Sequence, residues 1–312
     1  MREGSVSDIS NSFTLILTFS RLNMVDIFFS AFNRMKIDMK NCHLLVFDNT
    51  DMEPLAARLA ERVMEYAGHF RSVRLCKTYR RVGGDPVNAG DTGFRRSKLP
   101  MIYEMHLDMM KLLHTDKFVL IEDDTLPPPN AVMRLLQILD EYPGCGIATA
   151  IETGRSQLAY VKVRLGVHFV KRFGNKILER ISLNPKLRGL HSVDACGTYC
   201  CASFKNVWLQ GLEGMNEYLY DIPRFALDVT QTNNVKMRGW NILADFSLWC
   251  EHMQSYQGNF ISWGKRQAVP QLDIWLPEYQ EYAQGVLLTK PCHTKMLRNL
   301  TRQRDRAWKK RL

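Results

Sequence analysis

The sequence predicts an α/β fold in which a mostly parallel central sheet is flanked by helices. The first observation is that short apolar strands alternate with amphipathic helices over the first third of the chain. Such a β-α-β-α-β order requires parallel pairing with right-handed crossovers. The second is an apolar run at 118–121 that delivers three consecutive carboxylates into a proline-rich turn. In α/β proteins, groups at the carboxyl ends of strands face the crevice that binds ligands.

The elements of the first third follow from the spacing of apolar residues. Apolar residues three or four positions apart indicate helices, and short β-prone apolar runs indicate strands. The second helix starts near Asp51 and closes at Gly68. The predicted strands are 14–19, 43–47 and 72–78, and the predicted helices are 24–35 and 51–68.

A glycine-rich basic segment at 80–96 follows these elements. Backbone amides of such a loop approach phosphates closely, and Arg95, Arg96 and Lys98 would supply counter-charge. The segment lacks a GxxxxGK[ST] pattern, so it is not a P-loop, and a plain surface loop is an equal alternative. An amphipathic core helix is predicted next, from Leu99 to about His114.

Further elements are expected beyond the carboxylates. Asn130 occupies a capping position for a helix that runs to Leu139 and stops at Pro143-Gly144. The rest of the chain predicts a strand at 146–151, a basic and less regular stretch to Arg188, a strand at 193–204, a helix at 224–240 led by Asp228 and ended by Gly239, and a strand at 241–245.

Composition describes an ordinary globular chain. The 312 residues are 46% hydrophobic and 24% charged, which argues against disorder over most of the chain. The longest apolar segment, 13–32, contains Arg21 and Asp26, so no membrane span is predicted. No secretory signal is evident near the first residue, and a cytoplasmic location is expected.

Eight cysteines lie mainly in apolar surroundings without the paired spacing of a zinc site or a disulfide scaffold. Reduced thiols in the core are therefore expected. A zinc site is the lesser alternative, assembled from His191, Cys196, Cys200 and Cys201.

The formal net charge of +10 suggests a polyanionic partner, whether nucleic acid, anionic lipid or charged glycan. The positive excess gathers at 162–188 and in the tail at 295–311. A solvated basic face is the alternative of equal weight.

The three consecutive carboxylates are Glu122, Asp123 and Asp124. Hard divalent cations take oxygen ligands, so this turn predicts a metal site for a diphosphate. An exposed acidic turn without a ligand is the alternative reading of the segment alone.

In this context the chain resembles the family 2 nucleotide-sugar glycosyltransferases of GT-A fold, whose Rossmann-like sheet carries an acidic DxD-type motif before a Pro-containing turn. Glu122-Asp123-Asp124 resembles that motif, with Glu in its first position. Downstream, Asp228, the Arg238-Gly239-Trp240 segment, Asp245 and His252 match the family's order, although Leu227 replaces the Glu that usually precedes the base. The order, more than any single motif, carries the likeness over roughly residues 12–253.

The resemblance implies roles for these residues. Asp228 would be the catalytic base of a single-step inverting transfer, and Asp124 with His252 would bind Mn²⁺ or Mg²⁺. The donor, a UDP- or GDP-linked sugar, would contact a set made of Thr18, Ser20, Arg21, Asp48, Glu122 and Asp123. The implied domain spans 1–253, with a nucleotide-binding half at about 12–151 and an acceptor-binding half at about 152–253, followed by a basic extension at 254–312.

The acceptor is left open by the sequence. Positive charge slightly favours DNA with hydroxymethylated bases, while cell-surface glycans and lipid-linked acceptors are equally familiar for the family. A catalytically inactive nucleic-acid-binding protein with the same fold is the alternative of another class. A nucleotidyltransferase ranks low, because Ser20-Arg-Leu-Asn-Met24 follows the first strand where those enzymes carry a glycine-rich signature.

Overall fold

A computed structural model describes residues 12–20, 24–49, 53–77, 92–152, 166–173, 176–182, 187–215, 227–256 and 259–262. None of the helices in these ranges is long and apolar enough to cross a bilayer.

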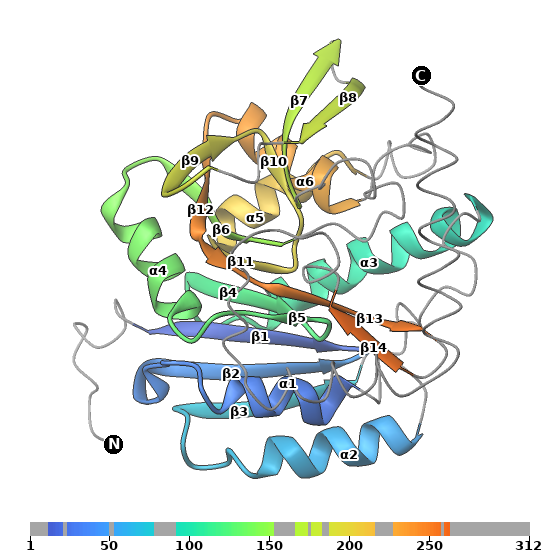
Figure 1. The fold of residues 1–312 in the computed structure, drawn as a ribbon, viewed down its shortest axis with the longest axis vertical. Helices are drawn as coiled ribbons and strands as arrows, with labels where there is room; N and C mark the ends of the chain where they lie inside the picture. The colour runs from blue at the N-terminus through green and yellow to red at the C-terminus, as the bar shows by residue number, and fades with distance from the viewer. Residues whose placement is uncertain are drawn as a thin grey trace.

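The central sheet confirms the predicted α/β class. Its strands are β1 (Phe13–Phe19), β2 (Cys42–Asp48), β3 (Ser72–Lys77), β4 (Lys117–Glu122), β6 (Cys145–Ile151), β9 (Leu190–Val193), β11 (Cys200–Phe204) and β12 (Asn241–Trp249). In the described residues they form one eight-stranded sheet in the order β3-β2-β1-β4-β11-β6-β12-β9 (Figure 1). The first four are parallel, as is the β6–β12 pair, whereas β11 and β9 run antiparallel to their neighbours.

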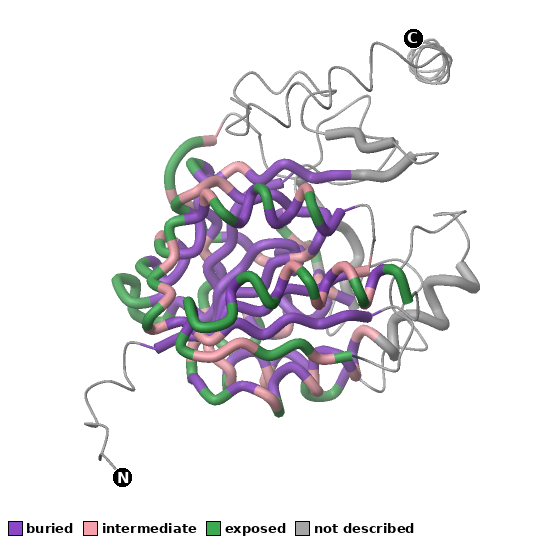
Figure 2. Tube along the Cα trace, turned by 90° about the horizontal axis from the view of Figure 1, so that it is seen from below, coloured by how far each residue is buried: buried purple, intermediate pink, exposed green. Residues whose placement is uncertain are grey.

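Helices cover both faces of this sheet. They are α1 (Val25–Phe32), α2 (Glu53–Met64), α3 (Thr92–Leu112), α4 (Ala131–Glu141), α5 (Lys205–Leu212) and α6 (Leu227–Met237), with a 3₁₀ turn, η3 (Met39–Asn41). Alternate residues of β1 divide between two buried cores: Leu15 and Leu17 pack with α1, α2 and α4, and Ile16 packs with α3, α5 and α6. This two-residue period is the geometry of a strand. Buried residues accordingly gather in the centre of the molecule, and exposed ones lie mainly around it (Figure 2).

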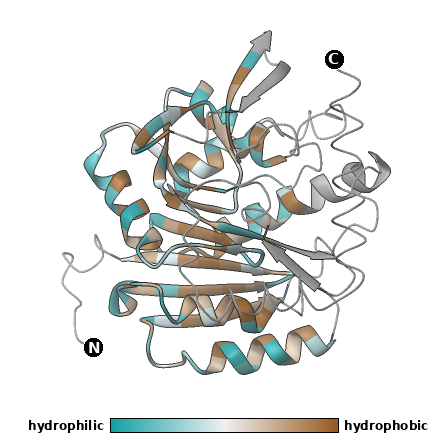
Figure 3. Cartoon of the chain, in the orientation of Figure 1, coloured by the Kyte–Doolittle hydropathy of each residue, from teal (hydrophilic) through white to brown (hydrophobic). Residues whose placement is uncertain are grey.

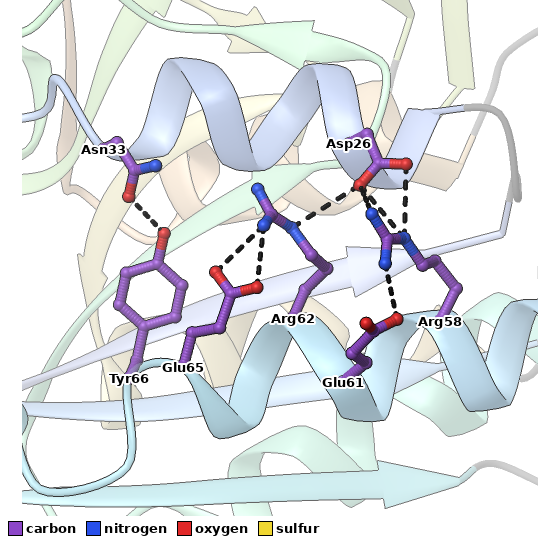
Figure 4. Close-up of polar contacts among 7 residues, drawn as sticks. All are labelled: Asp26, Asn33, Arg58, Glu61, Arg62, Glu65 and Tyr66. Atoms are coloured by element: carbon purple, nitrogen blue, oxygen red, sulfur yellow. Dashed lines mark hydrogen bonds and ion pairs between the residues drawn. The ribbon is translucent and has the colours of Figure 1, made fainter.

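The packing of α1 against α2 depends mainly on aromatic rings. Phe28, Phe29, Phe32 and Tyr66 stack or meet edge-to-face beneath the two helices. Polar contacts of the two helices lie beside these rings (Figure 4). Arg58 Nη2 lies 2.6 Å from Asp26 Oδ1. Further ion pairs join Arg58 to Glu61 and Arg62 to Glu65, and Tyr66 donates a hydrogen bond to Asn33. Ion pairs at an exposed surface contribute little to stability, so the rings decide the packing.

The helix after the acidic turn forms as predicted. Its apolar positions, including Val132, Leu135 and Leu139, are buried, while polar residues occupy its outer side (Figure 3). Asn130 stands at the N-cap, although its side chain makes no capping hydrogen bond. Gly144, with φ of 78°, then turns the chain toward β6 in the left-handed conformation that favours glycine.

Two smaller sheets attach to the central one. Their strands are β5 (Thr125–Leu126), β7 (Val167–Phe173), β8 (Lys176–Ser182), β10 (Ala195–Cys196), β13 (Glu251–Tyr256) and β14 (Asn259–Ser262). In the described residues the orders are β10-β7-β8 and β14-β13-β5. The β13 strand continues past residue 253, where the sequence predicted a domain boundary, and the domain bounds stay predictions.

Two predictions in the basic stretch and beside it were wrong. The region to Arg188 is not irregular where it is described, because β7 and β8 form an antiparallel hairpin. The segment 193–204 is not one strand but the end of β9, then β10, a turn and β11. Charged residues hide the strand period in a hairpin, and small residues such as Gly197 permit turns that a propensity argument does not locate.

The basic residues predicted to line a phosphate loop lie in a helix instead. The α3 helix begins at Thr92, so the backbone of Arg95, Arg96 and Lys98 is helical; 78–91 lie outside the described residues. The prediction began the helix at Leu99, after the glycine-rich segment. Pro100 stands inside the observed helix, because its fixed φ is helical, at the cost of one backbone hydrogen bond.

Candidate active site

The carboxyl ends of three parallel strands bring the predicted donor residues to one edge of the sheet. Thr18 of β1 is in register with Glu122 of β4, and Phe19 is in register with Asp48 of β2. A backbone hydrogen bond joins the ends of β1 and β4, because Asp123 N–H donates to Thr18 O at 3.0 Å. Arg21 lies outside the described residues.

Asp123 fastens the end of β1 to the acidic turn. Its Oδ2 accepts hydrogen bonds from Ser20 N–H at 2.7 Å and Ser20 Oγ–H at 3.2 Å. Hydrogen bonds to a buried carboxylate are stronger than neutral ones. The pair therefore fixes where the chain leaves β1, which is where the sequence predicted donor contacts.

Asp48 and Glu122 lie on either side of this point. Asp48 is buried at the end of β2, with Lys77 Nζ 3.8 Å from its Oδ2. Glu122 is only half-buried, and its Oε1 accepts a hydrogen bond of 2.7 Å from Thr198 Oγ1. Both carboxylates are thus at the predicted edge, with basic or hydroxyl partners already holding them.

Asp124 meets His252 through strand pairing. The β5 strand pairs antiparallel with β13, with Thr125 opposite His252, and Met253 N–H donates to Asp124 O at 2.7 Å. Consequently His252 Nε2 lies 3.2 Å from Asp124 Oδ2, and both side chains are buried. The two residues predicted to bind a metal are therefore in direct contact.

Glu152 is a site residue that the sequence analysis missed. It follows β6 directly, and its Oε1 lies 3.4 Å from His252 Nδ1. Burial raises the pKa of Glu152 well above its usual range, and the charges of Glu122 and Asp228 raise it further. The available signal was its place after a buried apolar strand, the same signal that marked Glu122.

Asp228 lies in the first turn of α6, partly exposed. Its Oδ1 accepts a hydrogen bond of 2.8 Å from Val229 N–H, and the positive end of the helix favours its charge. A Cβ atom built on Gly197 would stand 3.3 Å from Asp228 Oδ2, so glycine gives the carboxylate room. Backbone hydrogen bonds connect this place to Glu152, since Gly197 N–H donates to Gly166 O at 2.8 Å and Gly166 N–H donates to Glu152 O at 2.9 Å.

Thr232 ties the helix of Asp228 to the sheet. Its hydroxyl accepts from Cys196 N–H at 3.0 Å and lies within 2.9 Å of Cys196 O and 2.8 Å of Asp228 O. The turn that carries Asp228 is therefore fixed to β10 immediately before Gly197.

Comparison with solved structures gives the fold a name. GalNAc-T7, solved with UDP, GalNAc and Mn²⁺, superposes with a TM-score of 0.53 at 12% identity over 94% of this chain and 55% of that one. The chain has the GT-A fold. A mannosyltransferase, PcManGT from Pyrobaculum calidifontis, solved with GDP-Man and Mn²⁺, matches with a TM-score of 0.45 at 11% identity over 76% of this chain and 55% of its own. This GT-A chain thus spans about half the length of both structures. No protein-family model matches it, and neither does any curated protein.

Asp124 and His252 together suit a divalent cation that a bound ligand helps to hold. Adjacent positions around an octahedral ion with bonds of about 2.1 Å are about 3 Å apart, close to the Asp124–His252 separation. Among the described residues no group of three or more His, Cys, Asp or Glu side chains is arranged to hold a metal. An ion here would therefore take its other ligands from phosphate oxygens and water, as Mg²⁺ and Mn²⁺ do with phosphorylated ligands.

Cys196 is a buried thiol, and Asp245 is engaged by an arginine and a serine. Burial raises the pKa of the Cys196 thiol to about 12, and His191 Nε2 bonds Arg188 O instead of approaching a thiol, so the zinc alternative has no support in the described residues. Asp245 Oδ2 lies 3.1 Å from Arg134 Nε, and its Oδ1 accepts from Ser247 N–H and Oγ–H.

Proposed function

We propose that this protein is a metal-dependent inverting glycosyltransferase that moves a sugar from a UDP- or GDP-linked donor to an acceptor hydroxyl. The observation that carries the proposal is the direct contact between Asp124 and His252, with Glu152 beside the imidazole. Asp228 stands next to Gly197, which is connected to Glu152 through backbone hydrogen bonds of Gly166. A place for a cation beside a separate carboxylate base is what transfer from a diphosphate donor requires.

The Asp124–His252 pair and Asp228 have different roles. A divalent cation bound by Asp124 and His252 would offset the negative charge that develops on the departing diphosphate. Asp228 accepts the proton of the acceptor hydroxyl, for which its partial exposure and its place at a helix N-terminus suit it. Attack from the face opposite the leaving group inverts the anomeric carbon in one step.

Donor recognition is assigned to the strand ends. Asp48 contacts the base or ribose, and the Thr18–Ser20 segment, fixed by Asp123, lies against the nucleotide. Arg21 and Glu122 complete this set. From α3, the remaining candidates for phosphate contact are Arg95, Arg96 and Lys98.

For the acceptor we propose DNA carrying hydroxymethylated bases, which implies a cytoplasmic location. The net charge of +10 supports a polyanion. The described part of the basic stretch forms the β7–β8 hairpin, which projects from the body in Figure 1 and carries Lys171, Arg172, Lys176 and Arg180 against a single Glu179. A strand pair of this kind can place positive charge along a phosphate backbone.

A donor screen tests the catalytic proposal. Purified protein is incubated with a panel of UDP- and GDP-sugars in Mn²⁺, Mg²⁺ or EDTA, and release of UDP or GDP is followed. Slow hydrolysis of one donor that EDTA abolishes is the expected result. Absence of turnover and of metal-dependent donor binding across the panel would favour the inactive nucleic-acid-binding alternative.

Salt dependence tests the acceptor. Binding to hydroxymethylated DNA should weaken steeply between about 50 and 200 mM salt, because each phosphate contact releases counterions. Reversing the charge of Lys171 should lower the slope. Salt-independent binding, or transfer only to glycan or lipid-linked acceptors, would reject the DNA acceptor and leave the transferase proposal intact.

A further inference from the structure

His252 lies between two buried carboxylates. Its Nε2 is 3.2 Å from Asp124 Oδ2, and its Nδ1 is 3.4 Å from Glu152 Oε1. The three side chains are only 5%, 2% and 7% exposed for His252, Asp124 and Glu152 respectively. The two ring nitrogens therefore face different carboxylates in a site shielded from water.

Glu152 is itself held in place. Thr125 Oγ1 donates to its Oε2 at 3.2 Å, and its carbonyl oxygen accepts from Gly166 N–H at 2.9 Å. Thr125 is also the strand partner of His252. One carboxylate oxygen is thus engaged by the β5 hydroxyl, which directs the other toward Nδ1.

A neutral imidazole carries one proton, and the partner of one nitrogen decides which nitrogen keeps a lone pair. We propose that Glu152 is a positioning residue that holds the proton on His252 Nδ1, so that the Nε2 lone pair faces the cation position beside Asp124. The inference rests on the proposed metal-dependent function. It adds Glu152 as a residue that affects metal binding by orienting His252.

The geometry separates this role from direct ligation. The imidazole ring stands between Glu152 and Asp124, and the described residues contain no three-membered group arranged around one metal position. Histidine ligands are oriented in this way by an outer carboxylate in many metal sites, and loss of that partner typically weakens metal binding about 10–100-fold.

Mn²⁺ binding provides the test. Free Mn²⁺ is followed by electron paramagnetic resonance during titration of the full chain with UDP or GDP present. Glu152→Ala should weaken Mn²⁺ binding about 10–100-fold. Glu152→Gln should stay within about threefold of wild type, since its amide oxygen still accepts the Nδ1 proton. Asp140→Ala, which removes a surface carboxylate paired with Lys117, is the matched control and should bind like wild type.

The outcomes distinguish the inference from the proposed function. Wild-type affinity in Glu152→Ala overturns the inference alone, and equal loss in the Gln and Ala variants overturns it in favour of a direct ligand. No Mn²⁺ binding by wild type with either nucleotide overturns both. Should Glu152→Ala fail to fold, ¹⁵N-histidine spectra of wild type with Mg²⁺ decide: a proton on Nδ1 of His252 supports the inference, and a proton on Nε2 overturns it.

Discussion

The Nε2 atom of His252 lies 3.2 Å from Asp124 Oδ2, although 128 positions separate the two residues. The short β5–β13 pairing makes this contact, with Met253 N–H bonded to Asp124 O. The acidic motif therefore supplies one half of a candidate metal site, and a strand from the far end of the described chain supplies the other.

Asp124→Asn should remove metal-dependent donor turnover while leaving the fold intact. The amide lacks the charge that attracts a hard cation, so Mn²⁺ binding should fall by at least about 100-fold, more than for a supporting residue. Calorimetric titration of Mn²⁺ with nucleotide, alongside circular dichroism, measures both. Unchanged Mn²⁺ affinity would show that the ion binds elsewhere.

Asp228→Asn should lower kcat about 10²–10⁴-fold, the usual contribution of a general base. Donor KM should change little, because the substitution keeps the shape of the side chain and leaves the Asp124–His252 pair untouched. Steady-state kinetics with the donor found in the screen separates the two constants. Asp108→Asn, on the surface of α3, is the matched control. A rise in donor KM with unchanged kcat would assign Asp228 to donor binding instead.

Gly197→Ala should impair activity through packing. The added Cβ would lie 2.5 and 2.7 Å from ring atoms of Tyr199 and 3.3 Å from Asp228 Oδ2, so the ring or the base must move. Gly214→Ala is the contrasting variant, because φ is +74° there but nothing lies within 4 Å. It should lose about 1 kcal/mol of stability with normal kcat. Equal kcat values for the two variants would contradict the packing argument.

Asp123→Ala should cost about 2–4 kcal/mol of unfolding free energy, since it removes two hydrogen bonds to a buried carboxylate. Ser20→Ala removes only the longer of them and should cost about 1 kcal/mol. Urea denaturation compares the variants. If Ser20→Ala were as costly as Asp123→Ala, the backbone bond would contribute little.

Stability should fall as pH drops from about 6.5 to about 4. Burial lowers the pKa of His106 from 6.5 to about 4, while its bond to Gln231 acts in the opposite direction. The unfolded chain therefore binds a proton in this window that the folded chain does not, which costs the fold about 3 kcal/mol at the lower end. Urea denaturation between pH 4 and 7 should show a shallower dependence for His106→Asn. An unchanged slope would mean that His106 charges within the fold.

The sequence by itself determined the elements that carry their own pattern. Short apolar runs located β1, β2 and β4, helical spacing located α2 and α4, and the acidic turn at 122–124 marked the edge where ligand groups gather. These signals are local, because a strand buried on both faces or a helix buried on one needs a fixed spacing of apolar residues.

Only the tertiary structure decided which carboxylates act together. Glu152 was passed over because its one local signal, a place directly after a buried strand, does not say which groups it meets, and its partners His252 and Thr125 come from β13 and β5. The β7–β8 hairpin escaped prediction because its polar residues hide the strand period. Strand pairing between distant segments sets these contacts, and the free energy of that pairing belongs to the whole sheet and not to any stretch of sequence.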